Sequence, residues 1–280
     1  MSIFENRIKA TSQILGVLLS QPILEERVSE IEGLYDCPVF IDINDLNSFA
    51  NSFDRSHDYY LYFAEDGLSL KPFNKSKHGN IKVDFLAGKN NHRRIYSTSY
   101  RSDIARAFAI SSKNKPKILD CTAGFGSDAF SLASLGCEVK LIERNPLVYA
   151  LLYDGIQRMK MATRSDKHFK KCIDISCEYN DSICYLNESS DNKNFFDAIY
   201  LDPMFPPKSK NAKAKKEMQA IQNIIVFEGD YDKLLSAALE SKAKRVVVKR
   251  PVKGSFLSDI SPSFSIKART IRYDVFTKNG

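Results

Sequence analysis

The sequence predicts an α/β protein, with a doubly wound, mostly parallel sheet in residues 96–280 behind a small α+β domain in residues 1–95. From about residue 100, strand-like apolar runs alternate with segments of helical spacing, which is the pattern of βαβ units. Before that point, short apolar runs are broken by polar turns. A chain of 280 residues that is 43% hydrophobic can bury the cores of two modest domains.

The first part of the chain contains one expected helix and three expected strands. Apolar spacing within 8–19 predicts a helix, and Pro22 either ends it or begins the next element. The aromatic run at 59–63 predicts a strand, followed by a turn at 65–68. Further strands are expected at 68–73 and 81–85.

The second part contains the alternating elements of the expected sheet. Helices are expected at 102–111, 127–135 and 146–159, with Ser102 or Asp103 near the first cap. Strands are expected at 117–120, 139–143, 173–179, 198–202, 245–249 and 271–277. Because such sheets bind ligands at the carboxyl ends of their strands, the residues that follow each strand are the candidates for function.

A glycine turn, DCTAGFGSDA at 120–129, follows the first of these strands. Gly124 and Gly126 permit a tight turn beside a ligand, and the next helix offers free N–H groups. Glu143, 19 residues after Gly124, ends the second strand, where a carboxylate can accept two ribose hydroxyl hydrogen bonds. The pattern also fits a dinucleotide site, so an NAD-dependent oxidoreductase is one alternative.

Two features of the turn favour S-adenosylmethionine over NAD. Asp120 places a carboxylate at the strand end, suited to the methionine ammonium or to ordering the loop. Ser127 and Asp128 stand where a pyrophosphate would need basic residues.

The fourth strand ends in DPMFP at 202–206. The exocyclic amine of a base is a poor nucleophile because its lone pair is delocalised into the ring. A methyltransferase therefore has to hold the amine in line with the methyl group and accept hydrogen bonds from its N–H groups. The Asp202 carboxylate and the Pro203 carbonyl can accept them, and Phe205 can stack on the base. These three residues are the expected catalytic residues.

The charge distribution favours a polyanionic partner for the later part of the chain. The net charge is +7, but residues 1–46 carry −5, which leaves +12 for the rest. Basic stretches converge on the ends of the fourth and fifth strands, where phosphate contacts would steer a large RNA. A non-catalytic RNA-binding module is therefore a second alternative. The expected RNA contacts are His92, Arg93, Arg94, Lys208, Lys210, Lys213, Lys215, Lys216, Lys249 and Arg250.

Composition argues against a membrane span and against a metal site. No stretch approaches the roughly 18 consecutive apolar residues of a spanning helix. Six cysteines without a secretory signal suggest free thiols in a reducing, cytoplasmic setting. The group His168, Cys172, Cys177 and Cys184 lacks paired zinc-ligand spacing, so no metal is expected.

The chain resembles the bacterial ribosomal RNA small subunit methyltransferase J family, which methylates guanine N(2) in 16S ribosomal RNA. The resemblance implies a Rossmann-like S-adenosylmethionine-dependent methyltransferase fold, with 16S RNA or the small ribosomal subunit as partner. The matching stretches are VDF at 83–85, HRR at 92–94, 120–129, LIERNP at 141–146, YLDPMFP at 200–206, KKEM at 215–218 and RVVVKRP at 245–251.

The resemblance also implies which residues contact the cofactor. They are Ser127, Asp128, Glu143, Arg144, Asp181, Ser182 and Asp202. The chain departs from the family pattern at Ser127, often arginine there, and at the pair 181–182, often two serines. From its chemistry alone, the Asp181 carboxylate can accept the adenine amino group.

Overall fold

The computed structural model describes residues 8–9, 14–20, 35–36, 38–51, 59–73, 79–87, 99–165, 173–188, 195–203 and 229–278. Among these residues, those up to Val83 belong to one compact unit and those from Asp84 onward belong to a second. The expected domain boundary between residues 95 and 96 lies outside the described residues and stays a prediction.

The first unit contains a four-stranded sheet, in the order β4-β2-β5-β6, and one helix, α2 (Ile43–Asn51). Strand β2 is parallel to both of its neighbours, whereas β5 and β6 form an antiparallel hairpin. On α2, the fully buried Leu46 belongs to the same apolar cluster as Leu18 of β2. The strands are β1 (Ile8–Lys9) and β3 (Tyr35–Asp36), which pair separately, β2 (Ile14–Leu19), β4 (Val39–Phe40), β5 (Tyr59–Ala64) and β6 (Gly67–Pro72).

Two sequence predictions in this unit are wrong. Residues 14–19 form β2 rather than a helix, because this short apolar run pairs on both edges and is buried along 16–19, so it shows no alternation. The expected strand at 81–85 is reduced to a single bridge between Ile81 and Leu70. The strands expected at 59–63 and 68–73 are confirmed as β5 and β6.

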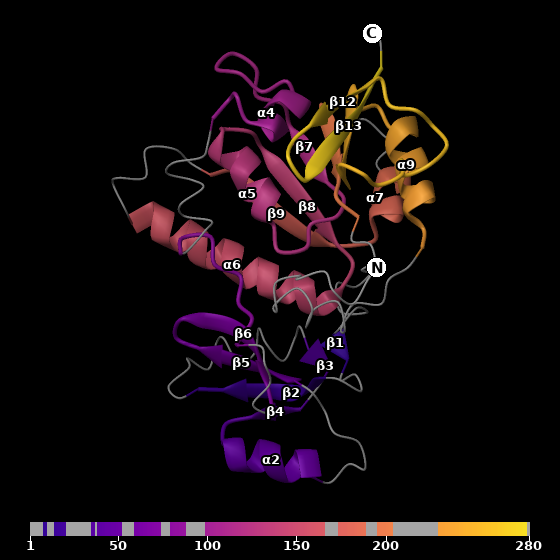
Figure 1. Ribbon diagram of the computed structural model, residues 1–280. Coiled ribbons are helices and arrows are strands. Elements are labelled where there is room, and N and C mark those ends of the chain that lie inside the picture. Colours follow the sequence, from indigo (N-terminus) through magenta and orange to yellow (C-terminus); the bar gives the residue numbers. More distant parts are fainter. Residues whose placement is uncertain are drawn as a thin grey trace. The chain divides into compact units, whose positions relative to one another are not determined.

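The second unit is built on a seven-stranded sheet in the order β12-β13-β11-β10-β7-β8-β9 (Figure 1). Strands β11, β10, β7, β8 and β9 are mutually parallel, and β13 is antiparallel to both of its neighbours. The expected doubly wound, mostly parallel sheet is therefore confirmed. The strands are β7 (Ile118–Asp120), β8 (Val139–Glu143), β9 (Ile175–Tyr179), β10 (Ala198–Leu201), β11 (Arg245–Pro251), β12 (Phe264–Lys267) and β13 (Ile271–Thr277).

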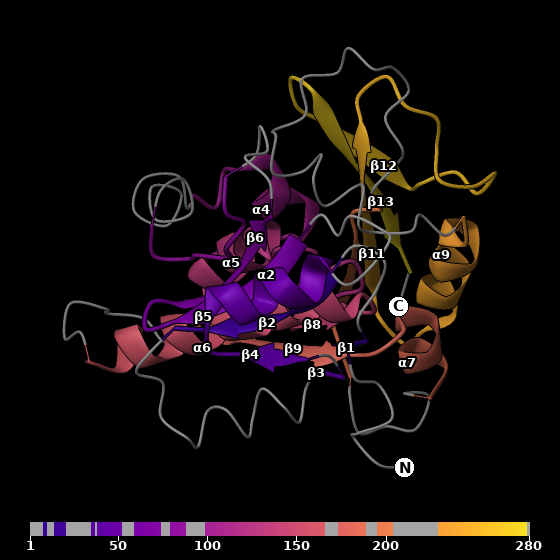
Figure 2. The same ribbon diagram turned by 90° about the horizontal axis from the view of Figure 1, so that it is seen from below.

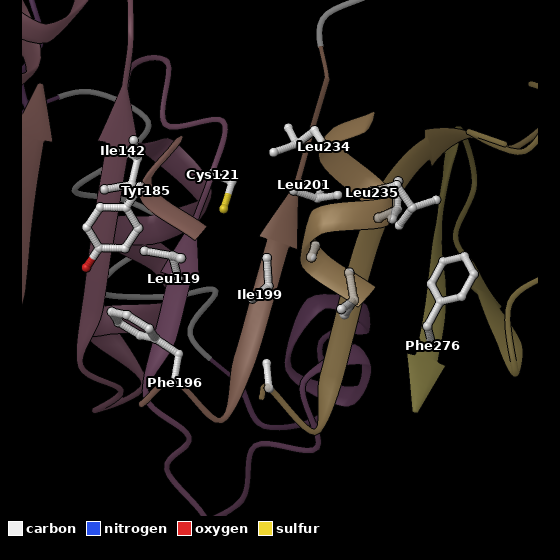
Figure 3. Close-up of a cluster of buried hydrophobic side chains, with 14 residues drawn as sticks. Leu119, Cys121, Ile142, Tyr185, Phe196, Ile199, Leu201, Leu234, Leu235 and Phe276 are labelled. Carbon is white, nitrogen blue, oxygen red and sulfur yellow. The ribbon is translucent and has the colours of Figure 1, made fainter. Parts of the chain in front are cut away.

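Helices cover both faces of this sheet. On one face, α7 (Ser182–Glu188) and α9 (Tyr231–Glu240) lie side by side, as Figure 2 shows. Their side chains pack on Leu119, Ile199 and Leu201 in a buried cluster (Figure 3). Helices α5 (Ser127–Ser134) and α6 (Pro146–Ser165) contact β8 and β9.

Three elements of this unit were not expected from the sequence: β12, α7 and α9. The expected helix at 102–111 is shorter, spanning α4 (Asp103–Ala107), with Ser102 as its N-cap as predicted. It ends at Ala107, and Ala109 shortly after it has a φ of 53°, outside the right-handed helical region.

The strand order reverses between β7 and β10, because the chain runs from β7 to β8 and β9 on one side and returns to β10 and β11 on the other. Such a switch point is where open α/β sheets bind ligands. The register pairs Tyr200 with Asp120 and with Val247. Since side chains alternate along a strand, Asp202 and Lys249 come next at the same edge and on the same face.

Candidate active site

The glycine turn after β7 takes the shape that the sequence predicts. Gly124 and Gly126 have φ values of 51° and 68°, in the left-handed region that favours glycine. A Cβ on Gly126 would lie 2.9 Å from Cδ1 of Leu152, so the turn also packs too closely for a side chain. Oδ1 of the buried Asp120 accepts hydrogen bonds from N of Thr122 at 3.0 Å and Oγ1 of Thr122 at 3.4 Å. Asp120 thus orders the loop, one of its two expected roles.

Glu143 at the end of β8 fastens this turn from the neighbouring strand. Its Oε2 accepts a hydrogen bond from N of Gly124 at 2.9 Å, and its Oε1 accepts one from N of Asn145 at 2.8 Å. Each carboxylate oxygen has a further lone pair, which a ribose hydroxyl can use. Burial raises the pKa of Glu143 to about 7, against the effect of these two hydrogen bonds.

Asp202, directly after β10, lies across the switch point from the turn. Its backbone N–H donates to Oγ1 of Thr122 at 2.6 Å, which joins the ends of β10 and β7. Its Oδ2 lies 2.8 Å from Nζ of Lys249, and its side chain is 38% exposed. Pro203 is buried beside it. The third expected catalytic residue, Phe205, lies outside the described residues.

Three carboxylates gather at this edge of the sheet: Asp120, Asp128 and Asp202. Burial raises the pKa of Asp120 to about 7, and the charges of Asp128 and Asp202 add to the shift. Lys249 lies 2.7 Å from Oδ2 of Asp128, and the hydroxyl of Tyr200 donates to the same oxygen at 2.7 Å. Three carboxyl groups face the ammonium of Lys249 and the guanidinium of Arg250, so acidic groups outnumber basic ones, which disfavours a pyrophosphate. The residues therefore fit S-adenosylmethionine, whose sulfonium and ammonium outweigh its single carboxylate.

The remaining expected cofactor residues lie next to the turn, and each has a partner within the protein. Oδ1 of Asp181 accepts hydrogen bonds from N of Ile183 and N of Cys184, at 2.9 and 3.0 Å, and so caps α7. Nη1 of Arg144 lies 2.9 Å from Oδ2 of Asp230 and 3.6 Å from Oδ2 of Asp181. The buried Ser182 hydroxyl donates to the Cys121 carbonyl at 2.7 Å. The contacts of these residues to a cofactor stay predictions.

The expected RNA contacts are described only at Lys249 and Arg250. Lys249 is held by two carboxylates, as above, and Arg250 is 5% exposed with Nε donating to the Ser255 carbonyl at 3.0 Å. The others lie outside the described residues: His92, Arg93, Arg94, Lys208, Lys210, Lys213, Lys215 and Lys216.

The sequence did not predict the residues that link the separate parts of the site by hydrogen bonds and ion pairs. These are Thr122, Tyr200 and Asp230, together with the ion-pairing role of Lys249. A signal existed for Lys249, because a lysine that directly follows the buried run 246–248 needs a carboxylate partner. In the described part of the chain, no group of three or more His, Cys, Asp or Glu side chains is arranged to hold a metal ion.

Comparison with known proteins identifies the class of protein. The family model for SAM-dependent methyltransferases matches residues 45–278. A crystal structure of a SAM-dependent methyltransferase from Neisseria gonorrhoeae superimposes with a TM-score of 0.68, at 26% identity over 94% of this chain and 95% of that one. The fold is that of a Rossmann-like S-adenosylmethionine-dependent methyltransferase, and the protein belongs to that class.

Curated relatives narrow the class to one family. A ribosomal RNA small subunit methyltransferase J from Cellvibrio japonicus is 40% identical over 79% of this chain and 84% of that protein. One from Pseudoalteromonas translucida is 40% identical over 80% of this chain and 87% of that protein. The chain belongs to the ribosomal RNA small subunit methyltransferase J family.

These findings confirm the fold class, the enzyme class, the cofactor and the family expected from the sequence. They support neither the oxidoreductase alternative nor the non-catalytic RNA-binding module. None of the helices in the described residues has the length and hydropathy needed to cross a membrane.

Proposed function

We propose that this protein transfers a methyl group to the exocyclic N(2) amine of a guanosine in 16S ribosomal RNA. The names of its relatives support small-subunit ribosomal RNA as the substrate, and the resemblance supports guanine N(2). The observation that carries the proposal is the position of Asp202 at the switch point. Its carboxylate is partly exposed and pairs with Lys249, and its backbone N–H donates to Oγ1 of Thr122.

The proposed cofactor residues surround the glycine turn. Glu143 would accept hydrogen bonds from the ribose hydroxyls, and Asp181 would accept one from the adenine amino group. Asp120, Asp128 and Asp202 provide the negative charge that favours the cationic end, while Gly124 and Gly126 allow close approach to the backbone. Ser127, Arg144 and Ser182 complete the proposed set. When bound, S-adenosylmethionine supplies a methyl group activated by a sulfonium sulfur.

The chemical task of the protein is to hold a weak nucleophile and stabilise the charge that it develops. The Asp202 carboxylate and the Pro203 carbonyl would accept the two N–H groups of the guanine amine, and Phe205 would stack on the base. As the nitrogen forms its bond to carbon, its N–H groups become more acidic, so the hydrogen bond to Asp202 strengthens towards the transition state. The same carboxylate would take the proton that leaves the nitrogen.

The basic residues would hold the RNA backbone. We assign phosphate contacts to the following basic residues, which lie outside the described ranges: His92, Arg93, Arg94, Lys208, Lys210, Lys213, Lys215 and Lys216.

We further propose that residues 96–280 form the catalytic domain and follow a smaller domain of residues 1–95 along the chain. The protein would act in the cytoplasm. The cysteines Cys121, Cys137, Cys177 and Cys184 are free thiols, which fits that setting.

Transfer of a tritiated methyl group to small-subunit RNA from a strain that lacks the enzyme tests the proposal. Mass-spectrometric mapping should then find one modified guanosine, with the methyl group on N(2). Asp202→Ala protein is the control, in which the rate of RNA labelling should fall by about 100-fold or more. Label on another base, or on no RNA at all, would contradict the proposal.

A further inference from the structure

Lys249 joins two carboxylates that come from different elements. Its Nζ lies 2.7 Å from Oδ2 of Asp128, in the first turn of α5, and 2.8 Å from Oδ2 of Asp202, after β10. The Lys249 side chain is 22% exposed, so both ion pairs are partly shielded from water. Charge-assisted contacts of this length fix both the position and the orientation of the groups that make them.

The ion pair leaves the two oxygens of Asp202 in different situations. Oδ2 is held by Lys249, and within the described residues no hydrogen bond reaches Oδ1. The backbone of Asp202 is also fixed, since its N–H donates to Oγ1 of Thr122. A carboxylate that is anchored through one oxygen and open at the other presents a single acceptor in a defined direction.

The surroundings of Asp202 would otherwise favour its protonated form. Burial raises the pKa of Asp202 above its usual value, and the charge of Asp128 from α5 adds to the rise. Asp120 from β7 is the third acid of this cluster. Lys249 is the largest influence in the opposite direction, followed by Arg250 on the same strand. Among the described residues, the other titratable groups that act on this cluster are the phenols of Tyr200 on β10 and Tyr273 on β13.

We propose that Lys249 is a positioning residue for methyl transfer, which holds Oδ2 of Asp202 and leaves Oδ1 for the substrate amine. This role rests on the proposed function, and it replaces phosphate contact as the role assigned to Lys249. A cation in this place acts on the rate through Asp202 and makes no contact with the RNA.

The test measures the titration of Asp202 directly, in cofactor-free protein that carries ¹³C-labelled aspartate. The Asp202 signal is identified by its loss in Asp202→Asn. Because an opposite charge within about 4–6 Å lowers the pKa of a carboxyl group by about 1–3 units, Lys249→Met should move the titration up by that amount. Lys249→Gln, which keeps a hydrogen-bond donor without the charge, should move it likewise, and Lys249→Arg should not.

Kinetics supply the second reading. At saturating cofactor, the acid limb of the pH profile of the single-turnover rate should shift to higher pH in Lys249→Met, by the same number of pH units as the Asp202 titration. The RNA concentration that gives half of the maximal rate should stay unchanged. Lys117→Met is the matched control, because it removes an ion pair of 2.8 Å, to Glu138, that involves no residue of the site. Neither its Asp202 titration nor its rate profile should change.

The wild-type protein gives a reading that needs no variant. Burial lowers the pKa of Lys249, but the charges of Asp202 and Asp128 outweigh it and raise the pKa above its ordinary value. The ¹⁵Nζ signal of Lys249 should therefore stay that of an ammonium at pH 10.5, the usual lysine midpoint. A neutral Lys249 there, or an Asp202 titration unmoved in both neutral variants, would overturn the proposal. These readings require no methyl transfer, so a failure here is distinct from a failure of the proposed function.

Discussion

Oε2 of Glu143 accepts a hydrogen bond from the backbone N–H of Gly124 at 2.9 Å, so the carboxylate expected to bind the ribose also closes the glycine turn. Its other oxygen accepts the N–H of Asn145, at the residue before α6 begins. Recognition of the cofactor and the shape of its binding loop therefore depend on one side chain. A loss of Glu143 would act on both.

Glu143→Ala should weaken S-adenosylmethionine binding by roughly 1.5–3 kcal/mol, the scale of hydrogen bonds to a charged group. Calorimetry on the folded variant measures this loss. Glu143→Gln should weaken binding by an intermediate amount. The amide oxygen can accept a hydrogen bond from one of the two backbone N–H groups, but the amide NH₂ is a donor and is repelled by the other. A folded Glu143→Ala protein with unchanged affinity would exclude Glu143 from the site.

The cofactor-free protein should lose stability as the pH rises from about 4 to about 7. Burial raises the pKa values of Asp120, from 3.8, and Glu143, from 4.5, to about 7 in the folded state. Between those limits the folded protein holds protons that the unfolded chain has released, so their contribution is fully present at low pH and is lost as the pH passes 7.

Urea unfolding at a series of pH values measures this effect. Asp120→Asn should reduce the dependence, since asparagine keeps the acceptor for N–H of Thr122 and cannot ionise. The exposed Asp259 gives a control, Asp259→Asn, that should leave the dependence as in wild type. Equal slopes in Asp120→Asn and wild type would contradict the prediction.

Asp202→Ala should lower the single-turnover rate of methyl transfer by about 100-fold or more, the scale for loss of one preorganised polar partner. Folding should survive, because Lys249 keeps its ion pair with Asp128. Asp202→Asn keeps an acceptor oxygen and should be the milder change. Rates at saturating cofactor and RNA separate these effects from binding; a near-normal rate for Asp202→Ala would mean that 202–206 is only a turn.

Neutralising Lys208, Lys210, Lys213, Lys215 and Lys216 together should weaken RNA binding for any sequence. The slope of log K against log salt should flatten by close to one unit for each phosphate that no longer pairs with a lysine. Affinity for the cofactor should stay constant, which calorimetry can verify. An unchanged salt slope would show that these lysines form a solvated surface.

The elements of the sheet were predictable because their signals are local. A strand that is buried on both faces must be apolar along its whole length, and it must end where polar residues begin. Strand β10, with the sequence AIYL, is apolar and buried along its whole length. Strands β8 and β13 also match their expected ranges of 139–143 and 271–277, although each includes charged residues. The run at 14–19 shows the limit, because an apolar stretch of six residues fits a buried helix as well as a buried strand.

The glycine turn, Glu143 and Asp202 were evident from the sequence, since each follows a strand and strand ends meet at one edge of a parallel sheet. The partners of these groups were decided by the tertiary structure alone. Lys249 is 47 residues from Asp202 and 121 residues from Asp128 along the chain. The pairing of β11 with β10, and of β10 with β7, which leads into α5, brings the three residues together. Sequence shows which charges are present at the strand ends, whereas strand register determines which of them come close enough to interact.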